Sequence, residues 1–336
     1  MSLISRLLKA NPSAQVSDML TGYFVIPSAK GAFEQVGTRG LFAGGKSPTN
    51  SNANSQNVIQ YIDIATTGNA TDFGDLNTAV NAFAGFGSTS RACFGGGKNT
   101  SGANLNVIDY VTTATTGNAT DFGDLLAVNA QLGGSSNATR GIFFGGYDTT
   151  DIGTIQYVTI ASTGNATSFG TMTRAEFTKQ GAGSSTRAIQ MGGAYNGGSN
   201  YSDTITYFEY ATTGNSTSFG TLTTDRVTPS VASSSTRALA MGGYSLGAGD
   251  RASIDYVTIA TTGNATNFGN LTLARYEGTG TSTNIRAVNA GGVPASPTNV
   301  IDYVTIATTG NATDFGDLLA GCMTFASASN GHGGLQ

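Results

Sequence analysis

The sequence repeats one pattern six times, and this repetition constrains the fold more than any other feature. The tripeptide Thr-Gly-Asn, followed by Ala or Ser, recurs with its glycine at Gly68, Gly117, Gly164, Gly214, Gly263 and Gly310. Consecutive copies are 49, 47, 50, 49 and 47 residues apart. A fixed period of this length is typical of solenoids and β-propellers, in which each repeat is one small structural unit.

Each repeat predicts four antiparallel strands. In the sixth copy the strand-like runs are residues 275–282, 285–292, 300–306 and 313–316, with a turn at 309–311. These runs are short, they contain β-branched and aromatic residues, and Gly, Asn and Ser bound them. Four such strands per repeat make one small sheet.

The third run of this copy is apolar on both sides. Alternation places Val304 and Ile306 on one face and Tyr303 and Thr305 on the other, and both faces are moderately apolar. A strand of this kind belongs to a sheet that is packed between two other sheets, as in a propeller or a solenoid.

The two ends of the repeat array distinguish a closed ring from an open stack. Residues 319–329 fit the first-strand position of a repeat, and the chain then lacks the later strands. The first copy enters at residues 38–45, the second-strand position. We therefore expect the C-terminal strand to complete the N-terminal blade. The prediction is an all-β, six-bladed β-propeller over residues 36–336, preceded by an arm at 1–35.

Composition limits the partners that such a ring can have. Charged residues make up 11% of the 336 residues, and the formal net charge is −4. This balance offers no basic surface, so neither a nucleic acid nor an anionic membrane is an expected partner. The first residues contain no apolar run long enough for a signal peptide or a membrane span, so we expect neither secretion nor membrane insertion. Cys93 and Cys322 fall in predicted strands of different blades, which argues against a disulfide framework.

The repeats resemble the kelch repeat. Each has a Gly-Gly pair, then a tyrosine, then a further aromatic residue. The pairs begin at Gly44, Gly95, Gly145, Gly192, Gly242 and Gly291, and the tyrosines are Tyr61, Tyr110, Tyr157, Tyr207, Tyr256 and Tyr303. The last aromatic residue departs from the kelch pattern, because phenylalanine stands where kelch has tryptophan, twelve residues after the tyrosine.

A second resemblance concerns the string IDYVTIATTGNATDFGDL at residues 301–318. Near copies lie at 108–125 and 254–271. The string is similar to kelch-like repeats of virion structural and tail-fibre-like proteins of tailed bacteriophages. The resemblance implies a non-enzymatic part of a virus particle, on the tail or capsid surface, that serves as an adhesin or as a decoration. A kelch-like protein–protein interaction module is the alternative, and a glycan-cleaving propeller enzyme is a further one.

Six arginines occupy one strand position of the repeat: Arg39, Arg91, Arg140, Arg187, Arg237 and Arg286. They could form an anion-binding crown for a sialic acid or a phosphate. Alternatively, each could pair with a backbone carbonyl or with an aspartate of a neighbouring strand, such as Asp109, Asp255 or Asp302. Because all six repeats keep the arginine, we favour the role in blade packing.

Two other repeated motifs suggest sites that we do not expect. The Asn-Ala-Thr and Asn-Ser-Thr sequons, for example at Asn69 and Asn215, are read as hairpin turns in which Gly and Asn adopt positive φ. The Asp-Phe-Gly-Asp segments, for example 72–75, are read as surface turns. Two carboxylates alone fall short of a calcium site. No metal and no cofactor is predicted.

Catalytic candidates are few. The single histidine, His332, lies in a glycine-rich tail without an evident Ser-His-Asp arrangement. Glu176, Glu209 and Glu277 are acids that a sialidase-like site could use, but nothing in the sequence brings them together. No catalytic residue is therefore predicted.

The loops that follow the Gly-Gly pairs differ most between repeats. They span residues 46–56, 98–106, 147–153, 194–202, 244–252 and 293–299. All six should emerge on one side of the ring, where aromatic and amide side chains could stack on a sugar and hydrogen-bond it. The candidates are Tyr147, Tyr195, Asn200, Tyr201 and Tyr244. Drift in unconstrained loops is the alternative.

The segment before the repeats is of a different kind. It carries two apolar groups, and the residues concerned are Leu3, Ile4, Leu7, Leu8, Phe24 and Ile26. A closed propeller does not need them. We expect a docking arm that binds another virion protein or a symmetry mate in an oligomeric assembly. Alternatively, the segment packs across the base of the ring.

Overall fold

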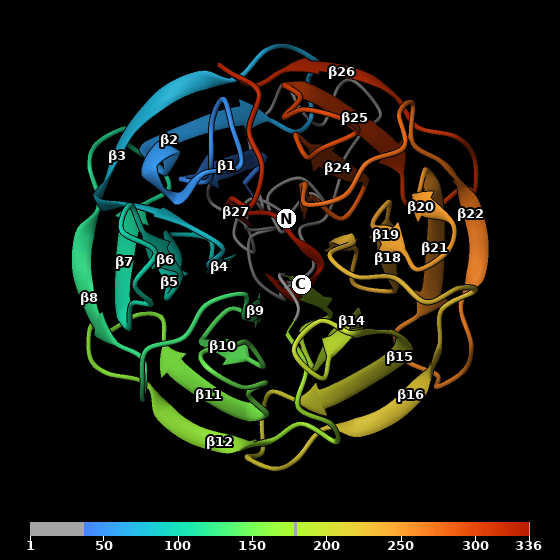
Figure 1. The fold of residues 1–336 in the computed structure, drawn as a ribbon, viewed down its shortest axis with the longest axis horizontal. Helices are drawn as coiled ribbons and strands as arrows, with labels where there is room; N and C mark the ends of the chain where they lie inside the picture. Colours follow the sequence, from blue (N-terminus) through green and yellow to red (C-terminus); the bar gives the residue numbers. More distant parts are fainter. Residues whose placement is uncertain (1–36, 178–179, 336) are drawn as a thin grey trace, which may run out of the picture. The chain divides into compact units, whose positions relative to one another are not determined.

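The computed structural model describes residues 37–177 and 180–335, which form six small antiparallel sheets arranged in a ring (Figure 1). The predicted six-bladed, all-β propeller with four strands per blade is confirmed. The chain divides into two units, Met1–Val36 and Gly37–Gln336. The predicted arm, with Leu3, Ile4, Leu7, Leu8, Phe24 and Ile26, lies outside the described residues.

The strands form four concentric layers. The innermost strands are β27 (Ala326–Ser329), β4 (Ala84–Gly87), β9 (Gly133–Ser136), β13 (Gly181–Gly183), β17 (Ser230–Ser233) and β23 (Thr279–Ser282). The second layer consists of β1 (Arg39–Ala43), β5 (Arg91–Gly95), β10 (Arg140–Phe144), β14 (Arg187–Tyr195), β18 (Arg237–Met241) and β24 (Arg286–Ala290).

The third layer consists of β2 (Gln56–Asp63), β7 (Val107–Thr112), β11 (Thr154–Thr159), β15 (Asn200–Glu209), β21 (Ser253–Thr258) and β25 (Val300–Thr305). The outermost strands are β3 (Thr71–Asn81), β8 (Thr120–Asp124), β12 (Thr167–Thr171), β16 (Thr217–Thr221), β22 (Thr266–Asn270) and β26 (Thr313–Asp317). Blades 1 to 6 follow the order of these lists. The loops add β6 (Lys98–Asn99), β19 (Tyr244–Ser245) and β20 (Gly249–Asp250), and short 3₁₀ turns lie at η1 (Asn52–Asn54) and η2 (Gly333–Leu335).

The C-terminal strand closes the ring as predicted. β27 pairs antiparallel with β1, with Gly40 opposite Ser329 and Ala43 opposite Ala326. The strand is shorter than the predicted run 319–329, because Thr324 has a φ of 57° and interrupts it. The predicted run 275–282 is shortened in the same way, because Glu277 has a φ of 58° and β23 begins only at Thr279.

These interruptions recur at one position of the repeat. The non-glycine residues with positive φ at this position are Ala82, Gln131, Thr228, Glu277 and Thr324. Left-handed backbone is unfavourable for such residues. Hydrogen bonds from blade to blade compensate for it: the Gln131 N–H donates to the Ala82 carbonyl, and the Ala82 N–H donates to the Thr324 carbonyl, both at 2.7 Å. The connections therefore form a linked collar around the ring axis.

The hydrophobic core lies between the blades. One cluster of buried residues, for example, joins Phe86 and Phe122 of blade 2 with Phe143 and Val158 of blade 3. This agrees with strands that are apolar on both faces. Cys93 and Cys322 are both buried and free, and burial raises the pKa of each thiol to about 12. Cys322 lies in the connection before β27, not in a strand.

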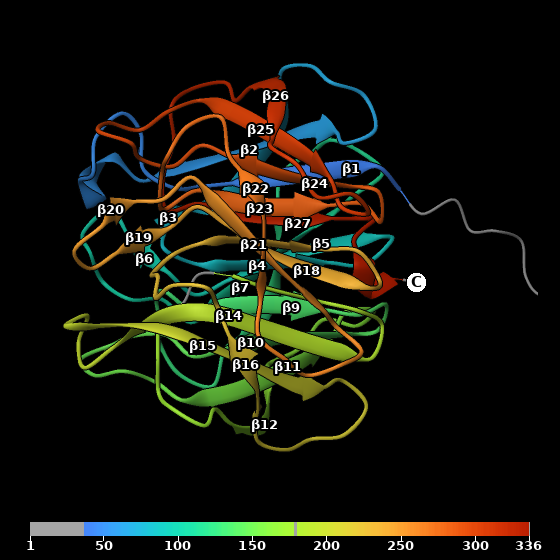
Figure 2. The same cartoon turned by 90° about the vertical axis from the view of Figure 1, so that its right-hand side faces the viewer.

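The variable loops lie on one side of the ring, seen on the left in Figure 2, where β6, β19 and β20 project. We call this side the loop face. The C-terminal tail reaches the opposite side, the tail face. Among the described residues no helix is both long enough and apolar enough to span a membrane.

Candidate functional site

Each of the six repeated arginines contacts its own blade and the blade that follows. Each guanidinium lies 4.4–4.8 Å from the ring centre of the repeat tyrosine of its own blade. Each also donates from a terminal nitrogen to a backbone carbonyl of the following blade. Arg91 donates to the Ile160 carbonyl at 2.9 Å, and Arg286 closes the set by donating to the Ile64 carbonyl at 3.2 Å. These contacts form a structural set on the outer part of the ring.

The partners of the arginines are carbonyls and not the repeated aspartates. Asp255 and Asp302 form buried ion pairs with two other arginines, Arg226 at 2.9 Å and Arg275 at 3.0 Å. Asp109 accepts a hydrogen bond from the Asn77 side chain at 2.7 Å. Of the two kinds of partner expected from the sequence, the carbonyl is the one present.

The Thr-Gly-Asn segments lie in the hairpin connections between the antiparallel third and fourth strands, as predicted, and they also join neighbouring blades. The positive φ predicted for the asparagines is wrong. None of the six asparagines has positive φ. Instead each side-chain oxygen accepts a backbone N–H from the outermost strand of the preceding blade, as Asn118 does from Asp75 at 3.0 Å. The same bond runs from Asp317 to Asn69 at 3.0 Å, so it also joins blade 6 to blade 1. The sequons therefore serve packing between blades.

The Asp-Phe-Gly-Asp segments are strands and not surface turns. Residues 72–75 lie in β3, and the corresponding segments form β8 and β26. The glycine permits close approach of the next blade, because a Cβ on Gly74 would lie 2.4 Å from the Gly117 carbonyl oxygen. Among the described residues, no group of three or more His, Cys, Asp or Glu side chains could hold a metal ion.

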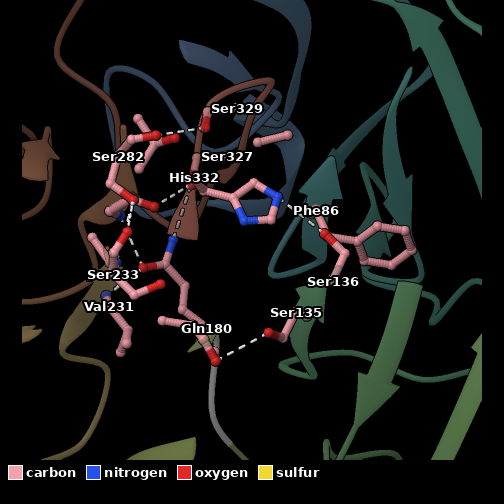
Figure 3. A pocket seen from close by; sticks show the side chains of 18 of the residues that line it. Phe86, Ser135, Ser136, Gln180, Val231, Ser233, Ser282, Ser327, Ser329 and His332 are labelled. Atoms are coloured by element: carbon pink, nitrogen blue, oxygen red, sulfur yellow. Dashed lines mark hydrogen bonds between the residues drawn. The ribbon is translucent and has the colours of Figure 1, made fainter. Parts of the chain in front are cut away.

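The single histidine lies inside the ring and not in a free tail. The innermost strands are rich in Gly, Ser and Ala, and they enclose a void of about 50 Å³ (Figure 3). His332 lines this void with its imidazole directed at Ser136, 3.2 Å away. Its Nε2 also lies 2.8 Å from the Gly87 carbonyl oxygen, and its Nδ1 accepts the Gly334 N–H at 3.1 Å.

These contacts assign the imidazole a structural role. The Gly87 carbonyl can only accept, so Nε2 carries the proton, and Nδ1 is the acceptor. An Nε2 that is protonated cannot take a proton from the Ser136 hydroxyl, and that hydroxyl itself donates to the Gly87 carbonyl at 2.6 Å. Enclosure within the ring lowers the pKa of His332, although the bond to Gly87 partly opposes this. The pair does not form a nucleophile and base.

The void is also crossed by Gln180. Its side-chain oxygen accepts the backbone N–H groups of Val231 and Gly280, each at 2.8 Å. Its amide nitrogen donates to Thr279 and, at 3.3 Å, to Ser327. The channel is thus filled by polar links between blades, and it offers no room for a ligand larger than a water molecule or two.

The three acids considered for catalysis lie far apart in the chain and have separate surroundings. Glu176 is buried, it accepts from Arg174 at 2.6 Å and from Gln190 at 3.1 Å, and its pKa is raised chiefly by burial. Glu209 accepts from Arg187 at 2.8 Å. Glu277 lies in the collar, next to Tyr276.

The loop face carries a hollow of about 370 Å³ over blades 3 to 6. Four aromatic rings line it: Phe177, Tyr201, Tyr244 and Tyr276. The remaining lining residues are Gln131, Gly198, Val227, Thr228 and Glu277, three of which belong to the collar. Its volume lies at the lower end of the range of small-ligand sites, about 300–1,000 Å³. This hollow is the candidate binding site.

The aromatic rings of the hollow support one another. The Tyr201 and Tyr244 ring centres are 6.0 Å apart with planes at 78°, and those of Tyr244 and Tyr276 are 5.4 Å apart at 63°. Tyr244 is held by β19, which pairs with β20 in a two-stranded hairpin. Edge-to-face contacts of this kind fix the rings before any ligand arrives.

Two of the five residues predicted for ligand binding line the hollow, namely Tyr201 and Tyr244. Tyr147 adjoins it, because its ring centre lies 5.8 Å from that of Phe177. Tyr195 lies elsewhere on the loop face and stacks against Arg174 at 3.9 Å. Asn200 accepts a hydrogen bond from Asn196 at 2.8 Å within its own loop.

Sequence reasoning missed Phe177, Tyr276 and Gln131, because they precede the innermost strands and do not belong to the loops that follow the Gly-Gly pairs. Glu277 was considered only as a catalytic acid. The sequence nevertheless contains a signal for the two aromatic residues. The positions equivalent to Phe177 and Tyr276 hold Asn81, Ala130, Val227 and Met323 in the other blades. An aromatic residue at this position of the repeat therefore occurs only in blades 4 and 6.

No protein-family model matches this chain, and no curated protein matches it. The six-bladed β-propeller is accordingly the class of protein that the structure defines, and the function has to be argued from the surface of the ring.

Proposed function

We propose that this protein is a non-enzymatic recognition protein of a tailed bacteriophage particle, which binds a host-surface glycan through the hollow on the loop face. The observation that carries the proposal is the gathering of four aromatic rings at one part of a face that otherwise varies between blades. Sugar rings present apolar C–H faces that stack on aromatic side chains, and their hydroxyls pair with polar groups such as Gln131 and Thr228 at the edge.

The absence of a paired carboxylate in the hollow supports a binding function over hydrolysis. Glycoside hydrolases of the common type place two carboxyl groups on either side of the scissile bond. Among the described residues that line the hollow, Glu277 is the single acid. Glu176 and Glu209 are engaged by Arg174 and Arg187.

The assignment to a virus particle rests on the resemblance of the repeat string at residues 301–318 to kelch-like repeats of phage virion proteins. In this proposal the protein is a tail fibre component, an adhesin or a capsid decoration. Residues 1–35 attach it to other virion proteins, and several copies assemble in the particle. Deletion of residues 1–30 should abolish incorporation into particles. Unchanged incorporation, measured by immunoblotting of purified particles, would refute the docking role.

One observation favours the second candidate, a kelch-like protein–protein interaction module. Leu246, at the tip of the β19–β20 hairpin beside the hollow, is 53% exposed. An exposed apolar side chain next to aromatic rings also suits a protein surface.

A glycan array probed with the full chain tests the proposed binding. We expect selective binding to a subset of glycans, which Tyr201→Ala and Tyr244→Ala abolish because each removes a wall of the hollow. Tyr195→Ala is the matched control, because this tyrosine lies on the same face outside the hollow. Binding that is equally lost in all three variants, or absent from the wild-type chain, would contradict glycan recognition. Retention of a protein partner in the same variants would favour the interaction module.

A further inference from the structure

The walls of the hollow are arranged to face a common space from several directions. Tyr244 stands between Tyr201 and Tyr276, with its plane at 78° to the first and 63° to the second. Phe177 lines the same hollow from blade 4. Steeply inclined rings can surround a compact group, whereas parallel rings can only sandwich a flat one. The face of each ring carries partial negative charge, which attracts cations.

The charged side chain that lines the hollow is negative, as the faces of the aromatic rings are. Among the described residues that line the hollow, Glu277 is the one with a charged side chain. Two further carboxylates lie at the hairpin that holds Tyr244, one on β20 and one in the connection before β17. Asp250 lies directly across the hairpin from Tyr244, and Asp225 accepts a hydrogen bond from Ser245 at 3.0 Å. Glu277 and Asp250 therefore place negative charge beside the Tyr276 ring, and Arg251 follows Asp250 directly in the chain.

The tyrosine hydroxyls respond to this negative charge. Burial is the first cause of the raised pKa of Tyr276, and the carboxylates of Glu277 and Asp250 raise it further. The pKa of Tyr201 is raised by burial first, then by Tyr244 and Asp225. The phenols stay protonated at neutral pH, so they offer neutral rings and hydroxyl groups. A ligand with a carboxylate or a phosphate would meet repulsion from these acids.

We propose that the hollow selects glycans that carry an ammonium group, as a free amino sugar or a choline substituent does, over neutral and acidic glycans. The inference rests on the proposed function for the place of binding and adds the charge of the ligand. The ammonium group lies among the rings of Tyr201, Tyr244 and Tyr276, and the sugar ring to which it is attached contacts the rim. The carboxylates of Asp225, Asp250 and Glu277 set the preference for a positively charged ligand through their negative charge.

The test compares two ligands that differ only in charge. Oligomers of glucosamine and of N-acetylglucosamine with the same length are titrated calorimetrically into the full chain, and choline chloride is titrated as the quaternary probe. We expect the glucosamine oligomer to bind about ten-fold more tightly than its acetylated counterpart, because only the ammonium group can form cation–π contacts with the rings. Choline binding without glucosamine binding would identify the quaternary source, and the reverse would identify the amino sugar.

Variants separate the rings from the acids. Tyr244→Ala should abolish binding of the cationic ligands, whereas Tyr244→Phe should retain it within about three-fold because the ring remains. Glu277→Gln should reduce the preference for glucosamine over N-acetylglucosamine, because it removes the carboxylate that lines the hollow. Tyr195→Ala should alter neither. Unfolding temperatures of all variants identify any loss of binding that is caused by loss of folding, and Tyr244→Phe remains informative if Tyr244→Ala unfolds.

The outcomes distinguish this inference from the proposed function. Equal binding of the two oligomers, or tighter binding of the acetylated one, would overturn the preference for a cation while glycan binding stands. If neither glucosamine nor choline binds, the cation preference is overturned, and the glycan array then decides independently whether the hollow binds neutral or acidic glycans.

Discussion

The outer part of the ring and the loop face are built from the same six repeats, yet they follow different rules. On the outside, each blade repeats the same stack, in which the tyrosine and phenylalanine ring centres lie 5.7–6.1 Å apart. On the loop face, the aromatic hollow lies over blades 3 to 6, and the positions of blades 1 and 2 that correspond to Phe177 and Tyr276 hold Met323 and Asn81. Every interface between blades requires the same contacts, so a residue that recurs in all six repeats indicates packing between blades. The loops also contact one another, but through pairs that are not repeated, such as Asn104 with Asp148 at 2.7 Å, and there the repeats diverge.

A buried layer below the loop face shows that variation alone does not indicate function. One repeat position holds Val80, Asn129, Glu176, Arg226, Arg275 and Cys322. Two of these side chains have charged partners in the third strand: Arg226 faces Asp255 and Arg275 faces Asp302. Divergence at this depth is compensated within the protein. The aromatic rings of the hollow also pack on one another, but unlike the buried layer they line a hollow on the surface.

The largest expected effect lies in this buried layer. Arg275→Met leaves the Asp302 carboxylate without its arginine in a site where both side chains are at most 1% exposed. Loss of one partner of a buried ion pair costs about 3–5 kcal/mol. We expect the free energy of unfolding in urea to fall by that amount. Val80→Met changes the equivalent position of blade 2, beside a void of about 20 Å³, and should cost less than about 1.5 kcal/mol. Similar losses in the two variants would show that the ion pair contributes little.

The second effect contrasts two glycines that face each other across the junction of blades 6 and 1. Gly316 has a φ of 145°, and a Cβ there would lie 2.5 Å from the Gly68 carbonyl oxygen. A Cβ on Gly68 itself would meet nothing within 4 Å. Gly316→Ala should therefore cost about 1–3 kcal/mol through overpacking, whereas Gly68→Ala should be close to neutral. Differential scanning calorimetry measures both, and equal unfolding temperatures would contradict the close approach.

The fold could be predicted from the sequence because its determinants are repeated, whereas the candidate site depends on residues that are not. Ring closure by residues near Ala326 followed from the incomplete first repeat. The collar did not, because a left-handed residue such as Glu277 has no sequence signal when it is not glycine. That omission led residues 275–282 to be assigned to one strand, and it hid Tyr276 from the search for binding residues. The position of His332 depends on the path of the tail across the ring, which no repeat encodes.

A third effect concerns pH and the tail. The pKa of His332 is lowered in the folded protein, so below its unfolded value of about 6.5 the unfolded chain binds a proton more readily than the folded one. Stability contributed by the neutral imidazole is therefore present above about pH 6.5 and is lost as the pH falls below it, by at most about 1.4 kcal/mol per pH unit. Other groups also titrate in this range, so the comparison is with His332→Gln. From pH 7 to pH 5.5 the wild-type chain should lose more stability than the variant, within that limit per pH unit, measured by urea unfolding. Parallel pH profiles would contradict the position of His332 inside the ring.

The smallest expected effects compare repeated contacts between blades with an unrepeated residue of the loop face. Asn69→Ala removes the acceptor for the Asp317 N–H at the junction of blades 6 and 1, and Asn118→Ala removes the equivalent acceptor between blades 1 and 2. Each should cost about 1 kcal/mol, the net value of one hydrogen bond, and the two losses should add because the sites are distant. Leu246→Ala, at an exposed loop tip, should change the unfolding free energy by less than about 0.5 kcal/mol. The losses in unfolding free energy of the two asparagine variants could differ from each other as much as they differ from that of Leu246→Ala. In that case the repeated contacts would not be equivalent, and a repeated residue would no longer indicate packing in this ring.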